Sequence, residues 1–157
     1  MYVESTIPSC ATARPSRDTI IAGHQAATML FWEEERHKYD LCISQDVLDE
    51  CGKGDSEVTR RRLELLEGIR MLPVTAEVEN LASIYKDLLK IPDRAKADCI
   101  HLAICVKWHI DYVLTWNFAH MGINTYIKLR EYNDQHGLWT PVLINPEDIL
   151  PEREVNL

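Results

Sequence analysis

Five short apolar segments, separated by longer helical segments, limit what this chain can fold into. They are MYV (residues 1–3), DLCIS (40–44), MLPV (71–74), DYVLT (111–115) and PVLIN (141–145). Strands with one exposed face alternate apolar and polar residues, but these segments do not. Strands of this kind, separated by helices, form a parallel sheet that helices cover on both faces. The sequence therefore predicts a single α/β domain over residues 1–157, a three-layer α/β/α fold around a mainly parallel sheet.

The segments between these strands carry apolar residues at helical spacing. We expect the first helix to begin near Ser16, its N-cap, because Pro8 ends any regular segment before it. Asp55 and Asp93 are expected N-caps of later helices. The helix after Asp93 is apolar around most of its circumference, which predicts a buried, central position. The predicted helices cover residues 16–39, 45–51, 56–69, 76–90, 94–109 and 124–137.

The composition limits the partners and the location of this protein. A net charge of −8 argues against tight, non-specific nucleic-acid binding but is compatible with an enzyme that gathers carboxylates around metal ions. The chain has no apolar run near the ~18 residues of a membrane helix and no basic region followed by an apolar stretch at its start. We therefore expect a cytoplasmic protein with no membrane partner. An odd number of cysteines without a CxxC pair predicts reduced thiols at Cys10, Cys42, Cys51, Cys99 and Cys105.

Polar residues follow three of the predicted strands, and function in parallel α/β sheets lies beyond the carboxyl ends of strands. Asp98 lies in the first turns of the predicted buried helix, where the positive end of the helix dipole tolerates a carboxylate. The polar residues are Glu4 after the first strand, Ser44, Asp49 and Glu50 after the second, and Thr115, Trp116 and Asn117 after the fourth.

We expect four acidic or amide side chains from these segments to converge at one edge of the sheet. A cluster of carboxylates repels itself unless cations bind, and hard oxygen ligands suit Mg²⁺ or Mn²⁺. The chemistry that uses this arrangement is metal-assisted phosphodiester hydrolysis, in which the metal lowers the pKa of a bound water and neutralises charge on the phosphate. Asp49 and Glu50 point about 100° apart on a helix, and the residues alone leave the choice between them open.

Four motifs, in order along the chain, resemble those of PIN-domain nucleases. They are ES (4–5), IS-x5-E (43–50), ADCIHLA (97–103) and LTWNFAH (114–120). Within this family the chain is most similar to VapC-like toxins of type II toxin–antitoxin systems. The resemblance implies an endoribonuclease that hydrolyses RNA by a metal-activated water, leaving a 5′-phosphate and a 3′-hydroxyl. It also implies a cognate antitoxin protein that shields the site, and a homodimer.

The resemblance implies that Glu4, Glu50, Asp98 and Asn117 are the catalytic residues and hold one or two Mg²⁺ or Mn²⁺ ions. Two of these residues depart from the family pattern. Glu4 stands where the family usually has Asp, and Asn117 stands where Asp is common, so the lost charge should weaken a second metal site. These departures favour an alternative, a catalytically impaired PIN module that binds RNA or protein without cleavage. A nucleotide-binding Rossmann-like domain is disfavoured, because no GxGxxG or GxxxxGK[ST] loop follows any strand.

Four residues near the strand ends have predicted supporting roles. Ser44 and Thr115 would hydrogen-bond the ligating carboxylates. Trp116 and His120 are candidate contacts to the RNA substrate, and Trp116 could stack on a base.

Two further patterns have both a structural and a functional interpretation. His101 and Cys105 lie four residues apart, a spacing that two zinc ligands could share. Because no second pair accompanies them, we expect core packing. The basic run Arg60-Arg61-Arg62 is interleaved with glutamates, which favours a solvated helix face over a contact with RNA or a partner.

Overall fold

The computed structural model describes residues 1–117 and 123–151 and contains, within them, one five-stranded sheet whose strands are all parallel. The strands are β1 (Tyr2–Val3), β2 (Cys42–Ser44), β3 (Arg70–Leu72), β4 (Tyr112–Leu114) and β5 (Val142–Ile144). Their spatial order is β3-β2-β1-β4-β5, so the first strand of the chain is the central one. The predicted α/β fold with a parallel sheet is therefore confirmed.

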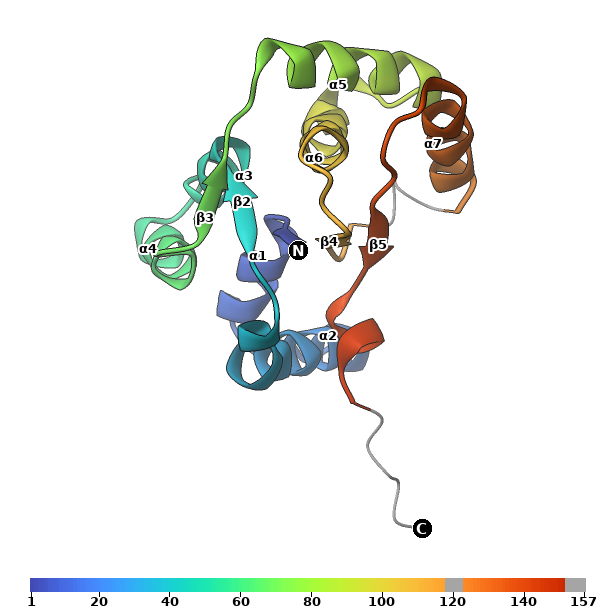
Figure 1. Cartoon of the computed structure of the whole chain (residues 1–157). Helices are drawn as coiled ribbons and strands as arrows, with labels where there is room; N and C mark the ends of the chain where they lie inside the picture. Colours follow the sequence, from blue (N-terminus) through green and yellow to red (C-terminus); the bar gives the residue numbers. More distant parts are fainter. Residues whose placement is uncertain (118–122, 152–157) are drawn as a thin grey trace.

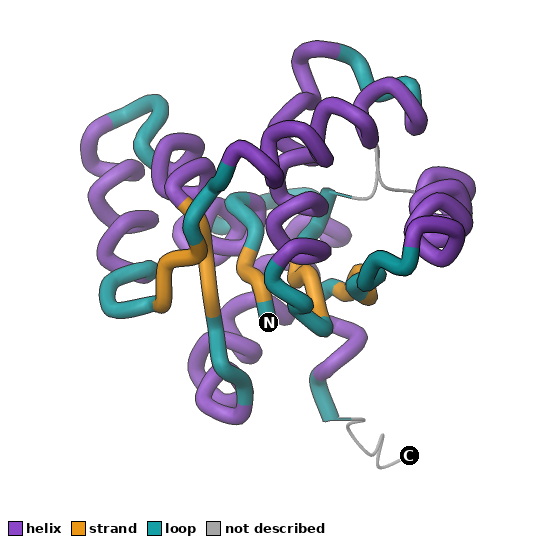
Figure 2. Tube along the Cα trace, turned by 45° about the horizontal axis from the view of Figure 1, so that its top comes forward, coloured by secondary structure: helices purple, strands orange, loops and turns teal. Residues whose placement is uncertain are grey.

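Helices cover both faces of this sheet, as predicted for three layers. Figure 1 shows α5 and α6 on one side of the strands and α1 and α2 on the other. Figure 2 shows the short strands at the centre with helices around them. The helices are α1 (Thr6–Thr12), α2 (Thr19–Leu30), α3 (Gln45–Cys51), α4 (Ser56–Leu65), α5 (Ala76–Leu89), α6 (Lys96–Lys107) and α7 (Ile123–His136). None of the described helices has both the length and the apolar character needed to cross a membrane.

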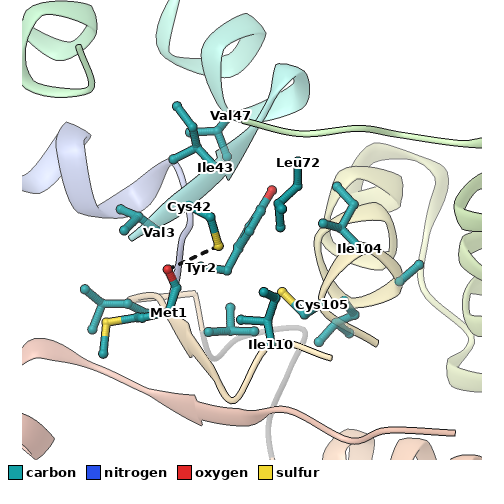
Figure 3. Close-up of a cluster of buried hydrophobic side chains, with 14 of the residues drawn as sticks. Met1, Tyr2, Val3, Cys42, Ile43, Val47, Leu72, Ile104, Cys105 and Ile110 are labelled. Carbon is teal, nitrogen blue, oxygen red and sulfur yellow. Dashed lines mark hydrogen bonds between the residues drawn. The ribbon is translucent and has the colours of Figure 1, made fainter. Parts of the chain in front are cut away.

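Helix α6 is the buried central helix that its apolar sequence predicted. Eight of its twelve residues are buried. Figure 3 shows the Tyr2 side chain among buried side chains from β2, β3 and α6, including Cys42, Leu72 and Cys105. Tyr2 is fully buried, but its hydroxyl makes polar contacts that lead to the candidate site. All five cysteines are free thiols, as predicted.

The prediction that Pro8 ends regular structure near the N-terminus is wrong. Pro8 lies in the first turn of α1, where backbone N–H groups have no partner within the helix, so a missing N–H is tolerated. The N-cap of the next helix also differs from the predicted Ser16. Asp18 caps α2 and accepts hydrogen bonds from the backbone N–H groups of Ile20 and Ile21 at 2.9 and 3.1 Å.

Three other predicted boundaries differ from the structure. The long first helix ends at Leu30 and continues as a π-helical turn (Phe31–Glu35) and a 3-10 turn (Arg36–Lys38). Asp93 does not cap α6; it begins a 3-10 turn that leads into the helix, and its carboxylate pairs with Lys86. Helix α4 ends at Leu65, before the predicted boundary, and Gly68 turns the chain towards β3 at a φ of 76°. Asp55, by contrast, caps α4 as predicted.

Candidate metal site

Three side chains from separate elements converge beyond the carboxyl ends of β1 and β2. Glu4 follows β1, Glu50 lies in α3 directly after β2, and His101 lies in α6. One ligand atom of each residue lies within 4.8 Å of the ligand atoms of the other two. The topology explains this meeting, because β1 and β2 are parallel neighbours and His101 contacts Tyr2 of β1. We call these three residues the Glu4–Glu50–His101 group.

The carboxylate of Glu4 is buried and held in place by neighbouring hydroxyl and amide groups. Glu4 is only 3% exposed. Ser5 Oγ donates to Oε1 at 2.8 Å, and the backbone N–H of Thr6 donates to Oε2 at 3.1 Å. The hydroxyls of Thr6 and Thr115 also donate to Oε2, the latter at 2.8 Å. The orientation of Glu4 is therefore determined by the protein before any ligand binds.

A chain of buried polar contacts holds His101 between the sheet and α3. The hydroxyl of Tyr2 lies 2.7 Å from Nδ1 of His101 and 2.7 Å from Oγ of Ser44. The other ring nitrogen, Nε2, lies 3.2 Å from Oε2 of Glu50. Tyr2 thus orients the imidazole so that Nε2 faces the carboxylates.

The electrostatics of the Glu50–His101 pair favour its charged form. Burial raises the pKa of the Glu50 carboxyl, but the hydrogen bond and charge of His101, with smaller contributions from Ser5 and Lys53, bring this pKa below its ordinary value. Burial lowers the pKa of His101, but the hydrogen bond and charge of Glu50 raise it above the ordinary value overall. Each partner therefore stabilises the charged state of the other.

Asp98 and Asn117 form a second polar pair, which the hydroxyl of Thr115 connects to Glu4. The side-chain amide of Asn117 donates to Oδ1 of Asp98 at 2.9 Å. The backbone N–H of Asn117 donates to Oγ1 of Thr115 at 2.9 Å, and that hydroxyl contacts Glu4. The four predicted ligands thus fall into two parts, with Glu4 and Glu50 in the three-residue group and Asp98 paired with Asn117.

Of the two residues predicted to hydrogen-bond the ligating carboxylates, only one contacts a carboxylate of the group. Thr115 contacts the Glu4 carboxylate, whereas Ser44 contacts the Tyr2 hydroxyl. Of the two acidic neighbours in α3, Glu50 reaches the group, while Asp49 is exposed and accepts a hydrogen bond from Gln45. Cys105 packs in the apolar core, as expected.

The two predicted substrate contacts can be placed only in part. Trp116 directly follows Thr115, and its indole stacks on the ring of His24 with a centroid distance of 4.0 Å. His120 lies outside the described residues.

Sequence reasoning considered His101 only as a zinc ligand paired with Cys105 and did not group it with Glu4 and Glu50. His101 lies three residues after Asp98 in α6, so the two side chains share a face of the helix. The spacing D-x-x-H in an otherwise apolar helix was the signal that could have identified it. A buried histidine in such a helix is more commonly a core residue, which is why the pattern was interpreted as packing.

The donor set of this group suits a divalent cation. Two carboxylates supply hard oxygen ligands, and His101 supplies a nitrogen. The hydrogen-bond donors to the Glu4 carboxylate among the described residues are all neutral, and the nearby charge that favours Glu4 is that of His101, whose pKa Glu4 helps to raise. A cation bound between Glu4 and Glu50 would offset the free-energy cost of gathering two carboxylates in a partly dry site.

Comparison of this chain with protein-family models, with curated proteins and with solved structures finds no match. The case for its function therefore depends on the geometry of the site and on the motifs in the sequence.

Proposed function

We propose that this protein is a divalent-metal-dependent endoribonuclease that resembles the PIN-domain nucleases of VapC-like toxins. The observation that carries the proposal is the convergence of Glu4, Glu50 and His101 at the carboxyl ends of parallel strands, with ligand atoms within 4.8 Å. The Asp98–Asn117 pair supports it, because it adds a further carboxylate linked to Glu4 through Thr115. Phosphodiester hydrolysis is among the reactions that such a metal site supports, and it is the one that the sequence motifs favour.

Glu4, Glu50 and His101 are the residues that would hold the cation. A bound Mg²⁺ or Mn²⁺ would supply Lewis acidity, which lowers the pKa of water and neutralises charge on the scissile phosphate. The imidazole favours Mn²⁺ of the two, because Mg²⁺ prefers oxygen ligands whereas imidazole nitrogen binds transition metals.

Side chains of the protein would orient the metal ligands and the attacking water. Ser5, Thr6 and Thr115 hold the Glu4 carboxylate, and Tyr2 holds the ring of His101. Asp98 offers a carboxylate that can accept a hydrogen bond from the attacking water. In the reaction, the water oxygen bonds to phosphorus while the bond from phosphorus to the 3′-oxygen breaks. The water gives up one proton through its hydrogen bond to Asp98, its hydroxyl stays on the 5′-phosphate, and the 3′-oxygen takes up a proton from solvent to leave as a 3′-hydroxyl.

The proposal is tested by RNA cleavage with purified protein that has been separated from any bound partner. We expect cleavage of single-stranded RNA with Mn²⁺, none with EDTA, and none with Asp98→Ala. Glu50→Gln keeps the size of the side chain and should lower the rate by about 100-fold or more, as removal of one stabilising group from an active site does. The control is Asp49→Asn, because Asp49 is exposed and bonded to Gln45. Absence of metal-dependent cleavage, or full activity of Glu50→Gln, would contradict the proposal.

A second candidate function is a PIN-like module that binds RNA or protein without cleaving it. The observation that favours it is that Asp98 accepts a hydrogen bond from Asn117, an uncharged residue at the fourth expected ligand position. In the same assay this alternative gives RNA binding without products in Mn²⁺.

The proposal has three further parts, of which the antitoxin and the homodimer come from the same resemblance and the location comes from the thiols. An antitoxin would co-purify with the protein from its native host. The chain has a mass of 18.1 kDa, and a homodimer would show twice that mass by light scattering. A cytoplasmic location is supported by the five free thiols, because thiols stay reduced in that compartment.

A further inference from the structure

A cavity of about 480 Å³ lies at the carboxyl end of α6, whereas Asp98 and His101 lie nearer the amino end of that helix. It is lined by residues of α5, of the end of α6 and of the segment after α7, in the region where α5 packs against both other helices (Figure 1). Within the described part of the chain, it shares no lining residue with the Glu4–Glu50–His101 group or the Asp98–Asn117 pair. Cavities of roughly 300–1,000 Å³ are typical sites for small molecules.

The walls of this cavity are largely apolar. They are formed by Leu81 and Ile84 of α5, Val106 of α6, and Leu138 and Trp139 after α7. Ile84 and Trp139 are 43% and 41% exposed, so both present apolar surface that the fold leaves open. An apolar group that enters the cavity would remove this surface from water together with its own, which favours binding.

Contacts within the protein fix the position of Trp139 before any ligand binds. Its indole Nε1 donates to the carbonyl oxygen of Ile110 at 2.8 Å, and its own carbonyl oxygen accepts from the side-chain amide of Asn133 at 2.9 Å. The imidazole of His109 stacks on the indole, with ring planes within 11° of parallel and centroids 5.8 Å apart. A wall that is already ordered loses little conformational freedom when a ligand binds, so more of the contact energy appears as affinity.

Two opposite charges lie side by side on the lining of the same cavity. Nζ of Lys107 pairs with the carboxylate of Glu77, and both side chains are exposed. Asn80, one turn after Glu77 in α5, adds an amide to this polar side. An exposed ion pair contributes little to stability, so its two members can exchange partners at little cost. A ligand with one positive and one negative charge would give each member a new partner, whereas a ligand with a single charge would leave one member without any.

We propose that this cavity binds a free α-amino acid with an aromatic side chain. Its ammonium group would lie on Glu77, its carboxylate on Lys107, and its ring against Trp139 and Ile84. An aromatic ring gains from an aromatic neighbour in addition to the burial of its surface. This inference goes beyond the proposed function and does not depend on it, because the two sites have no residue in common.

The test measures the Kd of L-phenylalanine and of matched analogues by ligand-observed NMR titration. Hydrocinnamate keeps the ring and the carboxylate but lacks the ammonium group, and phenethylamine keeps the ring and the ammonium group but lacks the carboxylate. L-Phenylalanine should bind about 10-fold more tightly than either analogue, the effect of one lost charge-assisted hydrogen bond. L-Alanine, which has both charges but no ring, should bind at least about 10-fold more weakly than L-phenylalanine, because it leaves the apolar walls uncovered.

Variants of the two charged residues test each contact separately. Glu77→Gln should abolish the preference for L-phenylalanine over hydrocinnamate, and Lys107→Met should abolish the preference over phenethylamine. Ile84→Ser changes an exposed side chain of the apolar wall and should weaken all three ligands alike. Glu79→Gln in α5 and Lys128→Met in α7 are the matched controls, because both residues are exposed and neither lines the cavity. Circular dichroism checks that each variant is folded.

Equal affinity for L-phenylalanine and its two single-charge analogues would overturn this inference. So would unchanged binding in Glu77→Gln and Lys107→Met, or no binding of L-phenylalanine at about 10 mM, where even a weak site is occupied. RNA cleavage by these variants is measured in parallel and should equal that of wild type. Failure of the nuclease proposal therefore leaves the amino-acid titrations unchanged, and failure of the titrations leaves the cleavage assay unchanged.

Discussion

The hydroxyl of Tyr2 lies 2.7 Å from Nδ1 of His101 and at the same distance from Oγ of Ser44. A tyrosine hydroxyl has one proton, so when it donates to Ser44 it accepts the Nδ1–H of the imidazole. Nε2 then faces Glu50, to which it donates in the charged pair, and it would present a lone pair to the proposed cation once that proton is released. Metal-binding histidines commonly have their second ring nitrogen held by such a partner. Tyr2 therefore connects the apolar core to the chemistry of the site.

Replacing Tyr2 with Phe should affect both stability and metal binding. The variant leaves the Ser44 hydroxyl and Nδ1 of His101 without the partner that Tyr2 supplies, which should lower the free energy of unfolding by about 1–3 kcal/mol. Mn²⁺ affinity should fall by roughly 10-fold, because the imidazole loses its orientation. Urea unfolding and calorimetry measure the two effects. Tyr85→Phe is the control: it removes another buried hydroxyl, bonded to Asn133 at 2.6 Å, and should destabilise the protein without changing Mn²⁺ affinity.

Metal preference tests the role of His101 as a ligand. Wild-type protein should bind Mn²⁺ more tightly than Mg²⁺, because imidazole nitrogen contributes to the former. His101→Gln should weaken Mn²⁺ binding by roughly 10- to 100-fold and leave Mg²⁺ binding less affected. Calorimetric titration with each ion gives both affinities. His109→Asn, which replaces a histidine outside the Glu4–Glu50–His101 group at a position with a φ of 51°, should behave as wild type. Equal affinities for both ions in the wild type would argue against a nitrogen ligand.

The Asp98–Asn117 pair makes a prediction about a second cation. Asn117→Asp replaces the amide that donates to Asp98 at 2.9 Å with a carboxylate, so two acidic groups face each other. The metal-free variant should lose roughly 1–3 kcal/mol of stability, and added Mn²⁺ should raise its Tm by more than it raises that of wild type. Thermal melts with and without Mn²⁺ measure this. The exchanged double variant Asp98→Asn/Asn117→Asp restores one amide and one carboxylate and should regain stability without metal. An equal Mn²⁺ effect on Asn117→Asp and wild type would contradict the prediction.

The stability of the metal-free protein should decrease as the pH rises above neutrality. Burial lowers the pKa of His101, but Glu50 raises it, and the result lies above the ordinary value of 6.5. Protonated His101 therefore stabilises the fold, and this contribution is fully present below pH 6.5. It is lost as the pH rises through the pKa that His101 has in the folded protein. The pKa of Glu50 is below its ordinary 4.5, because His101 and its other partners outweigh burial, so the contribution of Glu50 is present above that value and is lost in acid.

The check is urea unfolding in EDTA near pH 5.5 and near pH 8.5. We expect a larger free energy of unfolding at the lower pH, and a smaller difference in His101→Gln. An unchanged pH dependence in that variant would assign the effect to other groups.

The parallel fold could be predicted because its strands are apolar throughout and alternate with helices. That topology also brings Glu4 and Glu50 together, since both follow neighbouring parallel strands. The contact of His101 could not be predicted in the same way. Helix α6 is apolar on nearly all sides, so its sequence does not specify which face turns towards Tyr2. Only the packed structure fixes that rotation.

Local errors near the N-terminus have a different physical origin. Proline ends a helix from within but is tolerated in its first turn, so Pro8 alone could not distinguish these cases. The stacking of Trp116 on His24 depends on where α2 lies against the sheet. Sequence spacing carries no information on that placement, because the two residues are far apart in the chain.

The central position of β1 has a consequence for biosynthesis. The contact between Tyr2 and His101 spans 99 residues, and the contact between Glu4 and Thr115 spans 111. While the residues from His101 to Thr115 are still inside the ribosome, the chain cannot complete the Glu4–Glu50–His101 group and its supporting contacts, because β4 has not yet paired with β1. A probe that detects the Tyr2–His101 or Glu4–Thr115 contact would therefore report on the last stage of folding, and every unfinished copy of the chain would lack the proposed cation site.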